Sequence, residues 1–133
     1  LQDVGLGYIK LGQSSSTLSG GDNQRVKLAY FMSGEKRSHT VFIFDEPSTG
    51  LHFHDINTLL KSFDMLVKKG HTVIVIEHNL DIIKCADHII DLGPEGGAKG
   101  GQLIFEGTPE ALVKAGKGYT ARYLYAKLQE QKE

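Results

Sequence analysis

The stretch Val41-Phe42-Ile43-Phe44-Asp45-Glu46 decides the fold class, because it joins four consecutive apolar residues to two adjacent carboxylates. An unbroken run of β-branched and aromatic residues is typical of a parallel strand that is covered on both faces. Thr72 to Ile76 forms a second run of this kind, and between the two runs lies a helical pattern from Ile56 to Lys69 that Gly70 ends. The strand, helix and strand in this order predict a βαβ unit of an α/β fold.

Helix and strand patterns also occupy the rest of the chain. The predicted elements are a helix over 19–32, a short helix that begins at Asn79 or Asp81, strands over 88–90 and 102–106, a helix that begins at Thr108-Pro109-Glu110 and a last helix over 119–131. Within the βαβ unit, the predicted buried stripe of the helix consists of Ile56, Leu59, Leu60, Phe63 and Val67. We expect all 133 residues to form one partial domain.

The composition excludes several classes of protein. The chain contains 15 Lys and Arg against 16 Asp and Glu, which gives a net charge of −1 and argues against a strongly basic nucleic-acid arm. No apolar stretch approaches the roughly 20 residues that cross a bilayer. The single cysteine, Cys85, excludes an intrachain disulfide and a site of several thiolates, and its neighbours predict that it packs inside. A location in the reducing cytoplasm is expected.

Residues with catalytic chemistry follow both apolar runs. In open α/β sheets, ligands bind beyond the carboxyl ends of the strands, where Asp45 and Glu46 are expected to lie. Asp45 can hold Mg²⁺ through its water there, and Glu46 can orient and deprotonate an attacking water. A parallel neighbouring strand would place His78 at the same edge. The alternative for each is a polar turn residue beside solvent.

A third candidate site precedes the first predicted helix. Ser19-Gly20-Gly21 exposes backbone N–H groups at a helix N-terminus, and its glycines let an anion approach closely. The alternative is an ordinary helix with a serine cap.

Two weaker features also leave alternatives open. His52-Phe53-His54-Asp55 offers metal-ligating residues, but a stable site usually needs three or four ligands, so a turn into the next helix is favoured. Tyrosines at the C-terminal end, accompanied by basic residues, are expected to dock on the sheet, and the alternative is a stacking surface for DNA. These tyrosines are Tyr119, Tyr123 and Tyr125, and the basic residues are Lys117, Arg122 and Lys127.

Taken in order, these motifs resemble the ATP-binding-cassette (ABC) ATPases. The signature motif is matched by Leu18 to Asp22, the Walker B motif by Val41 to Glu46, the D-loop by Ser48 to His52 and the switch histidine by His78. The match is closer to the UvrA branch, on the strings at 45–55, 75–81 and 91–97. His52 stands where transporters usually carry aspartate, which also favours that branch.

The resemblance implies the fold and the roles of the candidate residues. The fold would be the C-terminal part of a P-loop NTPase domain of the ABC type, with a mostly parallel sheet flanked by helices. Glu46 would be the catalytic base, Asp45 the Mg²⁺ ligand through water, and His78 the γ-phosphate sensor. Ser19-Gly20-Gly21 would contact the ATP of an opposite cassette.

The resemblance also implies a function for a longer parent protein. That protein would hydrolyse ATP with Mg²⁺ and recognise DNA damage in bacterial nucleotide excision repair. Its partners would be DNA, the excinuclease helicase subunit and a second copy of itself through the cassette sandwich, and its zinc modules would lie outside this segment. The alternatives are a nucleotide-binding subunit of an ABC transporter and a non-enzymatic interaction module.

One motif of these ATPases is missing from the sequence. The chain contains no Gly-x-x-x-x-Gly-Lys-Ser/Thr, the Walker A loop that cradles the phosphates, and it begins at Leu1 and not at methionine. We therefore expect the C-terminal portion of a larger protein's second cassette, which hydrolyses no ATP alone.

Overall fold

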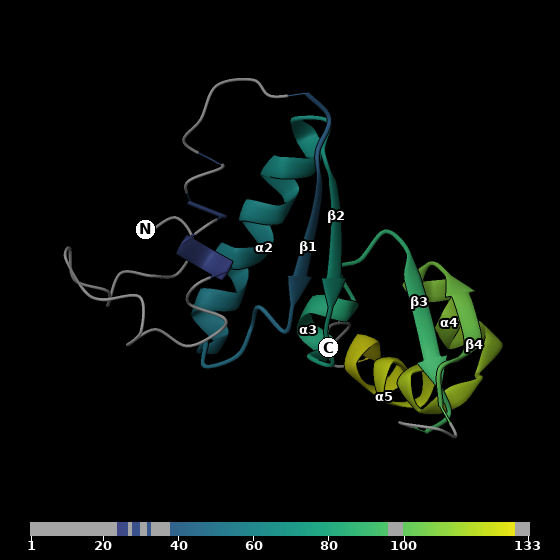
Figure 1. Ribbon diagram of the computed structural model, residues 1–133. Helices are drawn as coiled ribbons and strands as arrows, with labels where there is room; N and C mark the ends of the chain where they lie inside the picture. The colour runs from purple at the N-terminus through teal and green to yellow at the C-terminus, as the bar shows by residue number, and fades with distance from the viewer. Residues whose placement is uncertain (1–23, 27, 30–31, 33–37, 96–99, 130–133) are drawn as a thin grey trace. The chain divides into compact units, whose positions relative to one another are not determined.

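Two compact units make up the chain, one over Leu1–His78 and one over Asn79–Glu133. The computed structural model describes residues 24–26, 28–29, 32, 38–95 and 100–129 (Figure 1). The first unit contains β1 (Val41–Asp45), α2 (Phe53–Lys68) and β2 (Thr72–Ile76). The second contains α3 (Leu80–Ile83), β3 (Ile89–Gly93), β4 (Gln102–Gly107), α4 (Pro109–Ala115) and α5 (Gly118–Gln129).

The first unit is the βαβ arrangement that the sequence predicts. Strands β1 and β2 pair in parallel, from Val41 opposite Thr72 to Asp45 opposite Ile76, and α2 connects them (Figure 1). The predicted stop of the helix is confirmed, because Gly70 has a φ of 87° and its N–H donates to the carbonyl of Val67 at 2.9 Å. A positive φ of this kind is readily adopted by glycine.

The core of the first unit lies between α2 and one face of the sheet. The buried residues of α2 are Ile56, Leu59, Ser62, Phe63 and Leu66. The ring of Phe63 packs on that of Phe44 with centroids 5.0 Å apart. The predicted stripe was wrong at Val67, which is exposed, because Leu66 continues the face of Leu59 at a spacing of seven residues.

The other face of the β1–β2 sheet is open among the described residues. Alternate side chains of a strand point to opposite faces, and α2 covers only the face that carries Phe44. The expectation of strands covered on both faces was therefore wrong for the part of the chain that the structure describes. Four apolar side chains on the open face are between 48% and 66% exposed: Val41, Ile43, Ile74 and Ile76.

The second unit packs its helices on an antiparallel pair of strands, β3 and β4. Its core consists of Ile89, Leu112, Ala121 and Leu124. Both predicted helix starts are confirmed. The side-chain oxygen of Asn79 accepts from the N–H of Asp81 at 2.9 Å, and that of Thr108 accepts from the N–H of Ala111 at 3.2 Å. Such caps satisfy N–H groups that a helix start leaves without partners.

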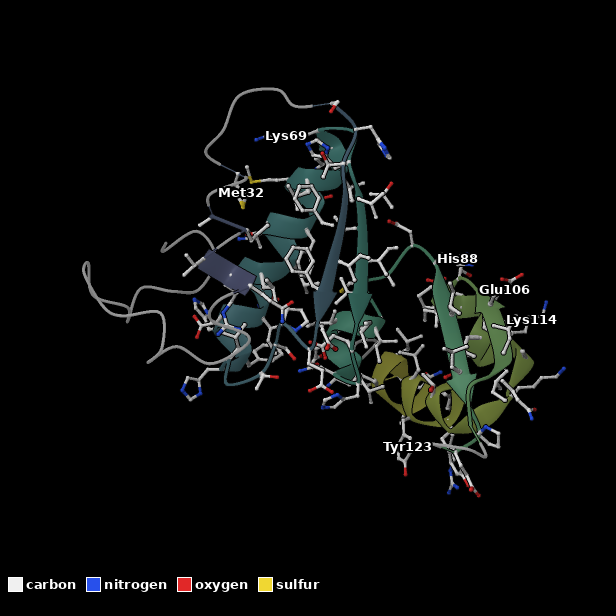
Figure 2. The ribbon with its side chains drawn as sticks, viewed as in Figure 1. Met32, Lys69, His88, Glu106, Lys114 and Tyr123 are labelled. Atoms are coloured by element: carbon white, nitrogen blue, oxygen red, sulfur yellow. The ribbon has the colours of Figure 1, made fainter. Side chains whose placement is uncertain are left out.

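Two predictions about packing in the second unit were wrong. Helix α5 buries Ala121 and Leu124, whereas the tyrosines that were expected to dock on the sheet are at least 55% exposed (Figure 2 labels Tyr123). These tyrosines are Tyr119, Tyr123 and Tyr125. Cys85 is exposed as well, with its thiol donating to the carbonyl of Asp81 at 3.3 Å. A stacking surface for DNA at the tyrosines stays a prediction.

Across the described ranges, no helix has the length and apolar character needed to span a membrane.

Candidate functional site

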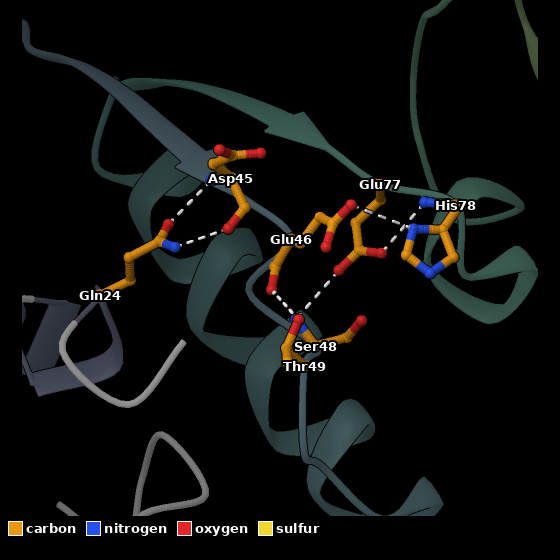
Figure 3. A network of polar contacts seen from close by, with 7 residues as sticks. All are labelled: Gln24, Asp45, Glu46, Ser48, Thr49, Glu77 and His78. Carbon is orange, nitrogen blue, oxygen red and sulfur yellow. Dashed lines mark hydrogen bonds and ion pairs between the residues drawn. The ribbon is translucent and has the colours of Figure 1, made fainter. Parts of the chain in front are cut away.

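The ends of β1 and β2 bring four polar residues to one edge of the sheet: Asp45, Glu46, Glu77 and His78 (Figure 3). Asp45 is the last residue of β1 and pairs with Ile76, the last residue of β2. The N–H of Glu46 then donates to the carbonyl of Ile76 at 2.9 Å. The parallel register thus places the three predicted residues Asp45, Glu46 and His78 at a shared edge, as the sequence indicates.

The backbone of Glu46 turns the chain sharply at the end of β1. Its φ is 44°, in the left-handed region that residues with a side chain rarely adopt. The Glu46 carbonyl accepts from the Thr49 N–H at 3.1 Å and from the Thr49 hydroxyl at 2.9 Å, which closes the turn. Conformations of this kind cost about 1–3 kcal/mol and are concentrated at functional sites.

Glu46 and His78 approach each other from the two strand ends. The Glu46 Oε1 lies 3.5 Å from the His78 Nδ1, and the two side chains are 54% and 79% exposed respectively. Exposed pairs of this kind contribute only about 0–1 kcal/mol, so the contact is easily exchanged for one with a ligand. A carboxylate and an imidazole side by side can hold a water and a phosphate oxygen at neighbouring positions.

The backbone of Asp45 is held while its carboxylate stays available. Gln24 clamps this backbone with both ends of its amide: Oε1 accepts from the Asp45 N–H at 2.8 Å, and Nε2 donates to the Asp45 carbonyl at 2.6 Å (Figure 3). Among the described residues, the Asp45 carboxylate makes no hydrogen bond or ion pair of its own. Carboxylate oxygens are ligands that Mg²⁺ prefers.

The described residues do not by themselves make a complete metal site. Nowhere in the described ranges do three or more His, Cys, Asp or Glu side chains come together to hold an ion. This applies also to the segment from His52 to Asp55, where His52 occupies the N-cap position of α2. A Mg²⁺ ion commonly takes one or two carboxylates and completes its shell with water and phosphate oxygens, so Asp45 fits that chemistry.

A buried arginine joins the preceding helical segment to the turn after β1. Arg25 is 1% exposed, and its Nη1 donates to the Pro47 carbonyl at 2.5 Å and to the Thr49 carbonyl at 3.4 Å. No pattern in the sequence predicts a role for Arg25, Gln24 or Glu77. Each is a polar residue beside a recognised motif, and this was the only indication of a role. It does not show which backbone groups, more than 20 residues away along the chain, the side chain contacts.

The anion site that was predicted at Ser19, Gly20 and Gly21 lies outside the described residues.

Comparison with known proteins gives one consistent result. No family model matches the chain. UvrABC system protein A of Clostridium perfringens is 61% identical over 124 residues, which is 93% of this chain and 13% of that protein. The same protein of Aquifex aeolicus is 55% identical over 131 residues, 98% of this chain and 14% of that protein.

A solved structure agrees with these relatives. The crystal structure of UvrA2 from Deinococcus radiodurans matches 95% of this chain and 15% of that protein, with a TM-score of 0.88 and 40% identity. The chain is a UvrA-like segment. Its α/β fold is confirmed as that of a partial ABC-type nucleotide-binding domain. The UvrA-like segment spans less than one sixth of the length of the proteins that it matches here.

Proposed function

We propose that this UvrA-like segment provides the water-activating part of an ATP site in a DNA repair protein. The observation that supports the proposal is the position of Glu46 and His78, 3.5 Å apart at the carboxyl ends of two parallel strands, next to Asp45. Similarity to UvrABC system protein A of up to 61% identity supplies the biological context.

Each residue of the edge has a definite task in this proposal. Bound Mg²⁺–ATP would supply the phosphoryl group: water attacks the γ-phosphorus, the bond to the β–γ bridging oxygen breaks, and ADP leaves. Glu46 orients the attacking water and takes its proton, and His78 donates a hydrogen bond to the γ-phosphate. Asp45 would hold Mg²⁺, through a water, by its carboxylate. Ser19-Gly20-Gly21 contacts the nucleotide of the opposite cassette.

The geometry of the edge suits these tasks. The Glu46 side chain is 54% exposed, so a water can reach it, and its contact with His78 is weak enough to open when phosphate binds. The Asp45 backbone is fixed by Gln24, which limits the positions that the carboxylate can take. A Mg²⁺ ligand whose backbone is held in place lowers the entropy cost of reaction.

The longer parent protein is proposed to recognise DNA damage in nucleotide excision repair. Its hydrolysis of ATP would be coupled to engagement of two cassettes, on DNA and with the excinuclease helicase subunit as partners, in the cytoplasm. The segment alone is proposed to hydrolyse no ATP, because its sequence has no Walker A loop to hold the β- and γ-phosphates.

Complementation tests the proposal. ATP turnover is measured for this chain alone, and again after addition of an N-terminal segment that carries the Walker A loop. We expect turnover only in the mixture, and a loss of about 100-fold or more in Glu46→Gln, because general base catalysis contributes about 10²–10⁴-fold.

The matched control is Glu106→Gln, an exposed glutamate of β4, which should leave turnover unchanged. Turnover by the chain alone would contradict the proposal. So would a mixture in which the two parts associate without hydrolysing ATP, a result that favours a non-enzymatic interaction module.

A further inference from the structure

We infer that Glu77 is a positioning residue, which holds the two strand ends so that His78 stays beside Glu46. Its carboxylate bridges two backbone donors (Figure 3). Oε1 accepts from the Ser48 N–H at 2.9 Å, and Oε2 accepts from the His78 N–H at 3.1 Å. The inference rests on the proposed function, since the arrangement that Glu77 maintains is the one to which that function assigns catalysis.

The bridge begins where the backbone pairing of the sheet ends. The last bond between the two strand ends runs from the Glu46 N–H to the Ile76 carbonyl. Ser48 lies inside the turn that the Thr49 N–H closes on the Glu46 carbonyl, and its own N–H donates to the Glu77 side chain and, among the described residues, to no strand carbonyl. The Glu77 carboxylate accepts from the Ser48 N–H and from the His78 N–H. The bond to Ser48 links the two strand ends beyond the last backbone pair of the sheet.

The Glu46–His78 contact cannot maintain this geometry by itself. The two side chains are 54% and 79% exposed, and an exposed contact at 3.5 Å is weak. Hydrogen bonds from backbone N–H groups to a carboxylate are charge-assisted and directional. They therefore constrain the two strand ends more strongly than the Glu46–His78 contact does. Glu77 is also less exposed than either member of the pair, which lessens competition from water.

The chemistry of the bridge requires two acceptor oxygens. Glutamine has the same length but one oxygen, and its amide nitrogen cannot accept a bond from an N–H. Glu77→Gln therefore retains at most one of the two bonds, and Glu77→Ala retains neither. This difference separates an effect of the bridge from a general effect of substitution.

Amide NMR on this chain tests the bridge directly. In Glu77→Ala we expect the Ser48 and His78 amide protons to move upfield and to exchange about 10- to 100-fold faster, as expected from loss of a bond to a charged acceptor. In Glu77→Gln, one of these two signals should shift and the other should stay. The amides of β1 and β2 report whether the unit is still folded, and Glu106→Gln is the control.

The same variants in the complemented ATPase test the catalytic consequence. Glu77→Ala should lower kcat by about 10- to 100-fold, with KM within about threefold, because misplaced groups slow chemistry more than binding. Glu77→Gln should lie between Ala and the natural residue. A purely structural role would reduce the amount of folded protein and leave the KM and kcat of the folded fraction unchanged.

The outcomes distinguish the two proposals. If the unsubstituted mixture hydrolyses no ATP, the proposed function fails, whatever the amide signals of Glu77→Ala show. If the mixture is active, and both amide signals and kcat in Glu77→Ala equal those of the natural chain, the assignment of Glu77 is overturned.

Discussion

Replacing Arg25 by methionine should destabilise the first unit, because Arg25 ties the preceding helical segment to the turn after β1. Arg25 is 1% exposed, and its guanidinium donates to the Pro47 carbonyl at 2.5 Å. Pro47 is fully buried as well. Methionine preserves much of the apolar stem and leaves that carbonyl without its donor. The change therefore removes the polar contacts of the guanidinium and keeps most of the packing of the stem.

The magnitude follows from the two bonds and from the burial of the charge. A hydrogen bond from a charged donor contributes about 1.5–3 kcal/mol. The second bond, to Thr49 at 3.4 Å, is near the limit for a hydrogen bond and adds little. Removal of a buried charge also returns part of its desolvation penalty. The expected loss is about 2 kcal/mol in the free energy of unfolding of the first unit.

Amide hydrogen exchange measures this loss for each unit separately. A loss of about 2 kcal/mol corresponds to roughly 30-fold faster exchange of the protected β1 and β2 amides. The β3 and β4 amides of the second unit should not change, and Arg122→Met, at an exposed position of α5, is the matched control. Equal β1 and β2 exchange in Arg25→Met and the natural chain would refute the reasoning.

Three further predictions concern strain, space and charge. Glu46→Gly should be more stable than Glu46→Ala by about 1 kcal/mol in thermal unfolding, because φ is 44° there; equal stability would contradict strain at this residue. Gly107→Ala should destabilise the second unit by about 1–3 kcal/mol in the exchange of β3 and β4 amides, since φ is 148° and an added Cβ would lie 2.9 Å from the Phe105 ring; unchanged exchange would show that the ring moves aside freely. Burial raises the pKa of Asp81, but the hydrogen bond and the positive charge of Lys84 outweigh that effect. The pKa of Asp81 is therefore below the usual 3.8. The second unit should therefore lose stability as the pH falls from about that value through the lower folded pKa, and Asp81→Asn should remove this part of its acid unfolding curve.

Local signals in the sequence predicted much of the fold. The apolar runs at Val41 and Thr72 gave the parallel pair, and the caps at Asn79 and Thr108 gave the helix starts. Each of these features is determined within a few residues of the chain. The location of the site at one edge of the sheet was predictable as well. The carboxyl ends of parallel strands lie at the same edge, and Glu46 directly follows the end of β1.

The remaining features depend on long-range contacts. Arg25 finds its carbonyl partner 22 residues along the chain, and Glu77 reaches back 29 residues to Ser48. No local pattern in the sequence shows which residues so far apart along the chain will form a hydrogen bond. The exposed tyrosines of α5 were misjudged because helical periodicity defines faces without showing which face is covered, and Ala121 and Leu124 occupy the covered one.

The most direct test of the central claim compares ATP binding with ATP turnover in the complemented chain. The measurement determines Kd and kcat side by side for the natural residue and for Glu46→Gln. If Glu46 activates the attacking water, Kd should stay within about threefold and kcat should fall by about 100-fold or more. Turnover that persists in Glu46→Gln at an unchanged Kd would contradict the assignment of this sheet edge as the hydrolytic part of an ATP site.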